Sequence, residues 1–259
     1  MSPFLLTGEG VVAFDPIDAD AATAYRKAIA TVSSAPVCAV VYSHDHRDHI
    51  VGGAKLAEPG VEVIAHPAAR DRIERRSDPD VLRPTRLLED RDELRFGEIV
   101  VETHHFGPNH SPSTVAYVLP TDAGRLLTFV DVVEPGVAPY RELPDTDVEG
   151  MLHSLREAEK LRFDTVIGGH CGPAGGEWVG LYRRYFEALL EATRAEWQRM
   201  GGQTSLPGED GVTMTERVRG LACAGAAARL ETEFGSWRGF AEWAPKNADR
   251  VLSYLITGS

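Results

Sequence analysis

Three histidines and an aspartate with metal-binding potential lie within six residues of chain. The stretch 43–49 reads Ser-His-Asp-His-Arg-Asp-His, which places His44, His46, Asp48 and His49 side by side. Imidazole nitrogen and carboxylate oxygen are the usual protein ligands of zinc, and they also suit iron and manganese. The competing interpretation is a polar loop with solvated histidines, and this spacing at a strand end disfavours it. Metal binding is therefore the first hypothesis.

The segments around this stretch predict that it occupies a turn between a strand and a helix. The apolar run 37–42 before it is typical of a buried strand, and residues 50–57 after it favour a short helix. In an extended chain His44 and His46 point to the same side, because they are two residues apart. Asp48 and His49 follow the bend and can face a second point nearby. This arrangement suits two metal ions better than one.

Three later residues supply further ligands. His110 lies in the stretch Gly-Pro-Asn-His-Ser-Pro, Asp131 follows the apolar strand 126–130, and His170 follows the strand-like run 165–169. Each stands in a turn after or between strands, where a sheet presents side chains to a cleft.

The motif His-x-His-x-Asp-His, taken with these three residues, resembles the metallo-β-lactamase fold superfamily of hydrolases over roughly residues 4–200. The resemblance implies two divalent metal ions, with zinc the first expectation and iron or manganese the alternatives. It also implies two groups of ligands. The first ion is held by His44, His46 and His110, the second by Asp48, His49 and His170, and Asp131 bridges the two.

The resemblance further implies an α/β fold, a four-layer αββα sandwich of two mixed sheets with extra C-terminal helices. The sequence agrees, because runs of strands and helices occur twice, before Arg76 and after Ile99. We expect a catalytic domain at 1–200 and a helical extension at 201–259, packed on it as a lid or dimer contact. The extension is predicted to hold helices at 213–234 and 237–255.

Local patterns predict several individual elements. Residues 4–14 favour a hairpin with a glycine turn, and residues 18–33 favour a helix capped by Asp18 or Asp15. Thr146 and Glu149 have the spacing of a capping box that opens a helix. Residues 77–95 are polar and contain two prolines, so we expect an irregular surface loop there.

Composition narrows the classes of function. The chain has 259 residues, 43% of them apolar, which fits one or two globular domains. Its net charge of −12 and the absence of a basic run argue against nucleic-acid binding. No apolar run approaches a membrane span and no signal peptide is visible, so we expect a cytoplasmic protein.

The three cysteines Cys38, Cys171 and Cys223 form no disulfide framework. Cys171 follows His170 directly, and we expect it to pack beside the site rather than bind metal.

The resemblance implies a chemistry in which two ions share a hydroxide that attacks a carbonyl, phosphoryl or sulfuryl centre. Asp48 is the expected catalytic residue, because it can orient the hydroxide or accept its proton. Tyr140, in the loop after Asp131, and His105, before the His110 loop, are candidate substrate contacts.

The function expected from these features is hydrolysis of a small ester, lactone, thioester or related molecule, in a branch similar to lactonases, glyoxalase II or sulfatases. β-Lactam hydrolysis is an alternative, although such branches usually lack the bridging aspartate and are exported. An iron-dependent oxidoreductase on the same fold is another, weakened by the missing flavodoxin-like domain. The expected partner is a small-molecule substrate, and a homodimer is an alternative to a monomer.

Overall fold

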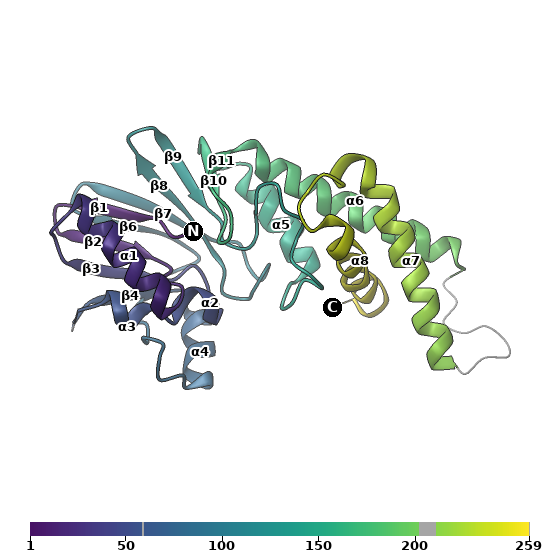
Figure 1. The fold of residues 1–259 in the computed structure, drawn as a ribbon, viewed down its shortest axis with the longest axis horizontal. Coiled ribbons are helices and arrows are strands. Elements are labelled where there is room, and N and C mark those ends of the chain that lie inside the picture. The colour runs from purple at the N-terminus through teal and green to yellow at the C-terminus, as the bar shows by residue number, and fades with distance from the viewer. Residues whose placement is uncertain (59, 202–210, 259) are drawn as a thin grey trace.

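The structure is a computed structural model that describes residues 1–58, 60–201 and 211–258. Two β-sheets lie at one end of the molecule, and the last three helices extend from them toward the other end (Figure 1). The first sheet has the strand order β1 (Phe4–Thr7), β2 (Gly10–Phe14), β3 (Val37–Val41), β4 (Glu62–Ala65) and β5 (Arg86–Leu87). The second has the order β11 (Ala174–Gly175), β10 (Thr165–Ile167), β9 (Gly124–Thr128), β8 (Val115–Thr121), β7 (Ile99–His105) and β6 (Arg91–Phe96).

Both sheets are mixed. The pair β1–β2 is antiparallel and the other pairs of the first sheet are parallel. In the second sheet β9–β10 is parallel and the other pairs are antiparallel. The hairpin predicted at 4–14 is confirmed as β1 and β2.

Strand β2 shows how the layers are built, because all five of its residues are buried. Side chains alternate along a strand, so Val11 and Ala13 face one apolar cluster while Val12 and Phe14 face another. The first cluster includes buried residues of α1 (Ala19–Val32), α3 (Gly53–Leu56) and α4 (Pro67–Arg76). The second cluster lies between the two sheets.

The outer face of the second sheet packs on α5 (Val148–Ala158) and α6 (Glu177–Arg199) in a third cluster. The order of layers is therefore helices, sheet, sheet, helices, and the predicted αββα sandwich is confirmed.

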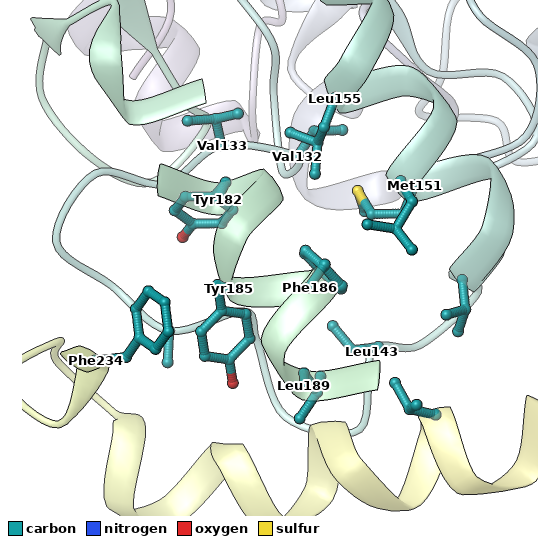
Figure 2. Close-up of a cluster of buried hydrophobic side chains, with 14 of the residues drawn as sticks. Val132, Val133, Leu143, Met151, Leu155, Tyr182, Tyr185, Phe186, Leu189 and Phe234 are labelled. Carbon is teal, nitrogen blue, oxygen red and sulfur yellow. The ribbon is translucent and has the colours of Figure 1, made fainter. Parts of the chain in front are cut away.

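The helices α7 (Gly211–Phe234) and α8 (Phe240–Thr257) share that third cluster with α5 and α6. Figure 2 shows Phe234 beside Tyr185 of α6, and their ring centroids are 5.2 Å apart. The Trp237 ring lies 5.2 Å from the Tyr182 ring and 5.4 Å from the Tyr185 ring, measured between centroids. One continuous core therefore joins the C-terminal helices to α6. Within the described ranges, no helix combines the length and apolar character needed to cross a membrane.

Two local predictions are wrong. The segment 77–95 is not a loop throughout, because it contains β5 and most of β6. Strand β6 carries buried Leu94 and Phe96 on one face and charged residues on the other. Because of these charged residues the segment resembles a polar loop in the sequence. The capping box at Thr146 is displaced by one residue. Asp147 caps α5 instead, accepting a hydrogen bond from the Gly150 amide at 2.6 Å.

The cap of α1 is confirmed. Asp18 is its N-cap, and its side chain accepts a hydrogen bond from the Ala21 amide at 2.8 Å.

Candidate metal centre

The first ligands lie where β3 ends and the short helix α2 (Arg47–Ile50) begins. The buried carboxylate of Asp15, at the end of β2, accepts a hydrogen bond from the Ser43 amide at 2.7 Å. This bond ties the chain at the end of β3 to its neighbour. His44 and His46 follow in non-helical backbone, whereas Asp48 and His49 lie in α2, as the predicted bend requires.

All seven predicted ligands converge in two groups that share Asp131. The two groups are His44, His46, His110 and Asp131, and then Asp48, His49, Asp131 and His170. These are the groups that the resemblance implies. Asp131 itself has φ of 61°, a backbone conformation that non-glycine residues rarely adopt. Strain of this kind is typical of functional positions.

The spacing of the ligand atoms fits metal ions. Two atoms bound tetrahedrally to one zinc ion lie roughly 3.3 Å apart, given bond lengths of about 2.0–2.1 Å. In the first group Oδ2 of Asp131 lies 3.6 Å from His44 Nε2 and 3.3 Å from His110 Nε2. In the second group His170 Nε2 lies 3.3 Å from Asp131 Oδ1 and 3.7 Å from Asp48 Oδ2.

Orphaned polar atoms give a second test of the fit. Nε2 of His44, Nε2 of His49 and Oδ1 of Asp131 are buried and make no hydrogen bond of good geometry, although His49 Nε2 lies 3.1 Å from Asp131 Oδ2 and His170 Nε2 lies 3.3 Å from Asp131 Oδ1. A buried polar atom without a partner costs about 1–3 kcal/mol. Metal coordination would satisfy all three atoms, so these residues fit the metals that the fold family implies.

Protonation in the metal-free site differs between the two groups. Burial lowers the pKa of His44 well below its usual value and that of His110 to about 4. Both imidazoles are therefore neutral, which is the form that binds metal. For His49, burial lowers the pKa but the Asp131 carboxylate outweighs it, so the pKa rises to about 9. A metal ion at the second position must displace that proton.

A carboxylate contacts the His46 ring on the nitrogen that does not face His110. Its Nδ1 faces His110 Nε2 at 3.0 Å, and its Nε2 lies 3.3 Å from Asp145 Oδ2. A carboxylate on the far ring nitrogen fixes the tautomer and the ring orientation of a metal-binding histidine. Arg72 of α4 donates a hydrogen bond to Asp145 at 2.5 Å and another to Asp45 at 2.8 Å.

Asp45 is the fully buried centre of this support. Its carboxylate accepts hydrogen bonds from Ser113 at 2.6 Å and from Arg72, and it forms an ion pair with Arg76 at 2.5 Å. Burial alone would raise the pKa of the Asp45 carboxyl, but these partners hold it below the usual value. The result is an ionised carboxylate that connects the motif to α4 and to the His110 loop.

The His170 loop is held by Glu134. Its carboxylate accepts hydrogen bonds from the backbone amides of Gly169 at 2.5 Å and His170 at 3.1 Å. Gly169 passes so close to the site that an added Cβ would lie 2.6 Å from both Asp131 Oδ1 and His49 Cε1. Only a residue without a side chain fits there.

A cavity of about 530 Å³ opens over the two groups. Five of the seven ligands line it: His46, Asp48, His110, Asp131 and His170. The other walls are mostly apolar and include Val132, Leu143, Met151, Phe186 and Trp243. Figure 2 shows Leu143, Met151, Tyr182 and Phe186 grouped around α6 and α5.

The two candidate substrate contacts separate in the structure. Tyr140 lines this cavity, with 55% of its surface exposed. His105 lies elsewhere, because its Nδ1 faces Asp90 Oδ1 at 3.2 Å, its Nε2 donates to the Pro112 carbonyl, and its ring stacks on His66. The position expected for His105 is therefore wrong.

Cys171 lines the cavity and is outside both ligand groups, as expected. Burial and the neighbouring Glu134 raise the pKa of its thiol to about 11.

Several residues around the site escaped the sequence analysis: Asp45, Arg72, Arg76, Ser113, Glu134 and Asp145. Asp45 stands between two ligand histidines, and Arg72 and Arg76 are four residues apart on a helix, so both signals were present. Asp145 carried no signal, because its partner His46 is 99 residues away.

A family model described as the metallo-beta-lactamase superfamily matches residues 7–170, and the chain belongs to this superfamily. The matched range contains all seven ligands.

Among solved structures, the chain is similar to a metallo-beta-lactamase from Pontibacter korlensis, with a TM-score of 0.62 and 17% identity over 71% of this chain and 85% of that one. It is also similar to the metallo-beta-lactamase IND-7, with a TM-score of 0.61 and 21% identity over 72% and 85% of the two chains. These likenesses show the fold.

Among curated proteins, the chain is similar to the 2,4-dinitroanisole O-demethylase subunit alpha of Nocardioides sp. (strain JS1661). The two are 31% identical over 192 residues, which is 72% of this chain. The match spans 56% of that relative's length.

Proposed function

We propose that the protein is a hydrolase that uses two divalent metal ions on a small ester, lactone, thioester or related substrate. The observation that carries the proposal is the convergence of seven ligands in two groups that share Asp131, beside a cavity of about 530 Å³ that five of them line. Bound divalent ions lower the pKa of water to about 7 and polarise the bond under attack. Zinc suits this ligand set best, and iron or manganese are alternatives.

Asp48 has a role beyond holding metal. Its side chain is 62% exposed and lines the cavity, whereas the Asp131 side chain is 11% exposed. A water that approaches from the cavity therefore meets the Asp48 carboxylate, which can orient it and accept its proton. Tyr140 lines the cavity, and its proposed role is to donate a hydrogen bond to an oxyanion on the substrate.

The apolar lining of the cavity favours a substrate with an aromatic or aliphatic body. Its walls include Phe186 and Trp243, and the Tyr140 and Trp243 rings meet edge to face at 5.2 Å. The name of the curated relative points the same way, because 2,4-dinitroanisole is an aromatic methyl ether. We therefore place aryl esters and aryl ethers among the substrates to be tested.

The same relative keeps a second function open. Cleavage of an aryl methyl ether by water gives a phenol and methanol, whereas oxidative demethylation by oxygen and a two-electron donor gives a phenol, formaldehyde and water. The histidine and carboxylate ligands also suit iron, so an iron-dependent oxidoreductase is the second candidate. β-Lactam hydrolysis ranks below both, since the two structures of that name are 17% and 21% identical to this chain.

One screen separates these candidates. Metal-free protein is reloaded with zinc, manganese or iron and given phenyl acetate, a γ-lactone, a thioester, 2,4-dinitroanisole and a β-lactam, with ascorbate as electron donor, in air and under argon. Hydrolysis predicts equal rates in air and under argon, active zinc-loaded protein, and methanol as the second product from the ether. Turnover restricted to the iron-loaded protein in air, with formaldehyde formed, would replace the hydrolase with the oxidoreductase.

A further inference from the structure

A guanidinium group stands in the wall of the cavity above the candidate metal centre. Among the described residues that line this cavity, Arg238 alone is an arginine or lysine. It comes from the turn between α7 and α8, outside the segment 7–170 that the family model matches. The motif that binds metal therefore does not account for it.

The backbone of Arg238 is fixed to the loop that follows Asp131. Its amide donates to the Gly136 carbonyl at 2.9 Å, and its carbonyl accepts from the Ala138 amide at 3.0 Å. The next residue, Gly239, has φ of 80°, and an added Cβ there would lie 2.5 Å from the Trp243 ring. This glycine therefore lets Trp243 pack against the turn, beside Arg238.

The charge of Arg238 has no carboxylate partner among the ion pairs of the described residues. Its recorded side-chain contact is from Nη2 to the Cys171 sulfur at 3.5 Å, and Cys171 directly follows the ligand His170. Sulfur is a weak acceptor. Glu134, a carboxylate in the same wall, accepts hydrogen bonds from the amides of Gly169 and His170. Several guanidinium donors are thus left to meet a ligand.

We propose that Arg238 binds an anionic oxygen group, such as a carboxylate, on the body of an aromatic substrate whose reacting bond lies at the metal centre. Resting on the proposed function, this inference adds the substrate class: aryl esters or ethers that carry a carboxylate away from the reacting bond. Arginine suits this role, because its planar fork matches the two oxygens of a carboxylate. The aromatic ring occupies the apolar wall formed by residues such as Phe186 and Trp243.

Electrostatics leaves two attractive positions for such an anion. The cavity wall also contains the carboxylates of Asp48, Asp131 and Glu134, and the whole chain has a net charge of −12. A substrate carboxylate is repelled by these groups and attracted by Arg238 or by the metal ions. Any test must therefore separate attraction by Arg238 from attraction by the metals.

The first arm is kinetic and uses two esters that differ only in the remote group. Zinc-loaded protein is given 4-acetoxybenzoate, which is anionic, and its methyl ester, which is neutral. The wild type is expected to have the higher kcat/KM on the anionic ester. Arg238→Gln should lower that value about tenfold or more, which is the usual effect of removing a hydrogen bond to a charged group. The kcat/KM for the neutral ester should not change. Arg238→Lys should lose less, because it keeps the charge.

The second arm removes the metals and needs no turnover. Calorimetry measures 4-hydroxybenzoate and neutral 4-hydroxybenzamide binding to metal-free wild type and Arg238→Gln. The wild type should prefer the anion, and the variant should lose that preference. Arg141→Gln is the matched control, because it removes the same charge near the cavity mouth, where Arg141 lies over the Tyr140 ring without lining the cavity.

The outcomes separate this inference from the proposed function. If neither ester is hydrolysed but the binding preference disappears only in Arg238→Gln, the hydrolase proposal fails and the Arg238 site stands. If both esters are hydrolysed and Arg238→Gln keeps the wild-type preference in either arm, the Arg238 site is overturned. Equal losses in Arg238→Gln and Arg141→Gln would also overturn it, because general charge would then explain the effect.

Discussion

Nε2 of His46 lies 3.3 Å from Oδ2 of Asp145. A carboxylate therefore contacts the ring nitrogen of His46 that does not face His110. Asp145 is in turn bound by Arg72, which also binds the buried Asp45. The orientation of one ligand therefore depends on residues from three separate segments of the chain. This support predicts that metal affinity can be altered without touching a ligand.

Asp145→Ala should weaken metal binding at the first position by about 10- to 100-fold, the usual effect of losing an outer carboxylate. Competition with a chromophoric zinc chelator measures the affinity. Asp71→Ala is the control, because Asp71 is an exposed residue of α4 that pairs with Arg70. Equal affinities for the two variants would show that Asp145 does not support His46.

Asp48→Asn tests the catalytic role of Asp48. The change keeps the shape and one oxygen ligand but removes the negative charge, so the attacking water loses its proton acceptor. We expect turnover to fall by about a hundredfold or more, with the first metal position still filled. Metal content is measured beside each rate, and near-normal turnover with both metals bound would refute the general-base role.

The control for this experiment follows from the structure. His66→Ala is unsuitable as the control, because the His66 side chain caps α4 by accepting from the Ala68 amide and its Nε2 lies 3.1 Å from Asp90 Oδ1. Asp122→Asn is a better control, because Asp122 is exposed in the turn between β8 and β9.

Gly169→Ala should empty the second metal position and leave the first one filled. The added methyl group would lie 2.6 Å from Asp131 Oδ1 and His49 Cε1, so at least one ligand must move. Gly172→Ala is the matched control, because a Cβ added at Gly172 would have Met1 Cε as its nearest neighbour, at 3.9 Å. Elemental analysis should give about one ion per chain for Gly169→Ala and the wild-type content for Gly172→Ala. Wild-type content in both would contradict this close packing.

The pH dependence of stability should carry a contribution from His66. Burial and the adjacent His105 lower the pKa of His66 in the folded protein, although Asp90 opposes the shift. Between that value and the ordinary pKa of about 6.5, the unfolded chain binds more protons. His66 therefore makes its full contribution to the free energy of unfolding above about pH 6.5. This contribution declines as the pH falls toward the pKa of His66 in the folded protein.

Urea unfolding of metal-free protein at pH 7.5 and 5.5 checks this sign. His66→Asn is the comparison, because asparagine can still cap α4 and does not titrate. The wild type should lose more stability than His66→Asn over this interval. An equal or smaller loss in the wild type would show that His66 is not responsible.

The ligands could be read from the sequence because metal chemistry restricts residue type and spacing. His44, His46, Asp48 and His49 are close in the chain, and His110, Asp131 and His170 each follow a segment that reads as a strand or turn. The layers could be read for a similar reason, since short apolar runs rich in β-branched residues, such as 37–41, favour buried strands.

The supporting residues could not be read, because their partners are distant in sequence and polar residues of many roles look alike. Asp145 and Arg238 stand in polar stretches, and only the fold places one behind His46 and the other in the cavity wall. His105 shows the converse error. Its position before the His110 loop indicated the cleft, but its side chain lies against His66 and Asp90 instead.

The central claim is a pair of metal ions joined by Asp131, and elemental analysis of metal-replete protein tests it most directly. Purified protein, reloaded with zinc and freed of excess metal by gel filtration, is compared with Asp131→Ala. The account predicts about two ions per chain for the wild type and fewer for the variant, because Asp131 belongs to both ligand groups. One ion or none in the wild type would contradict it.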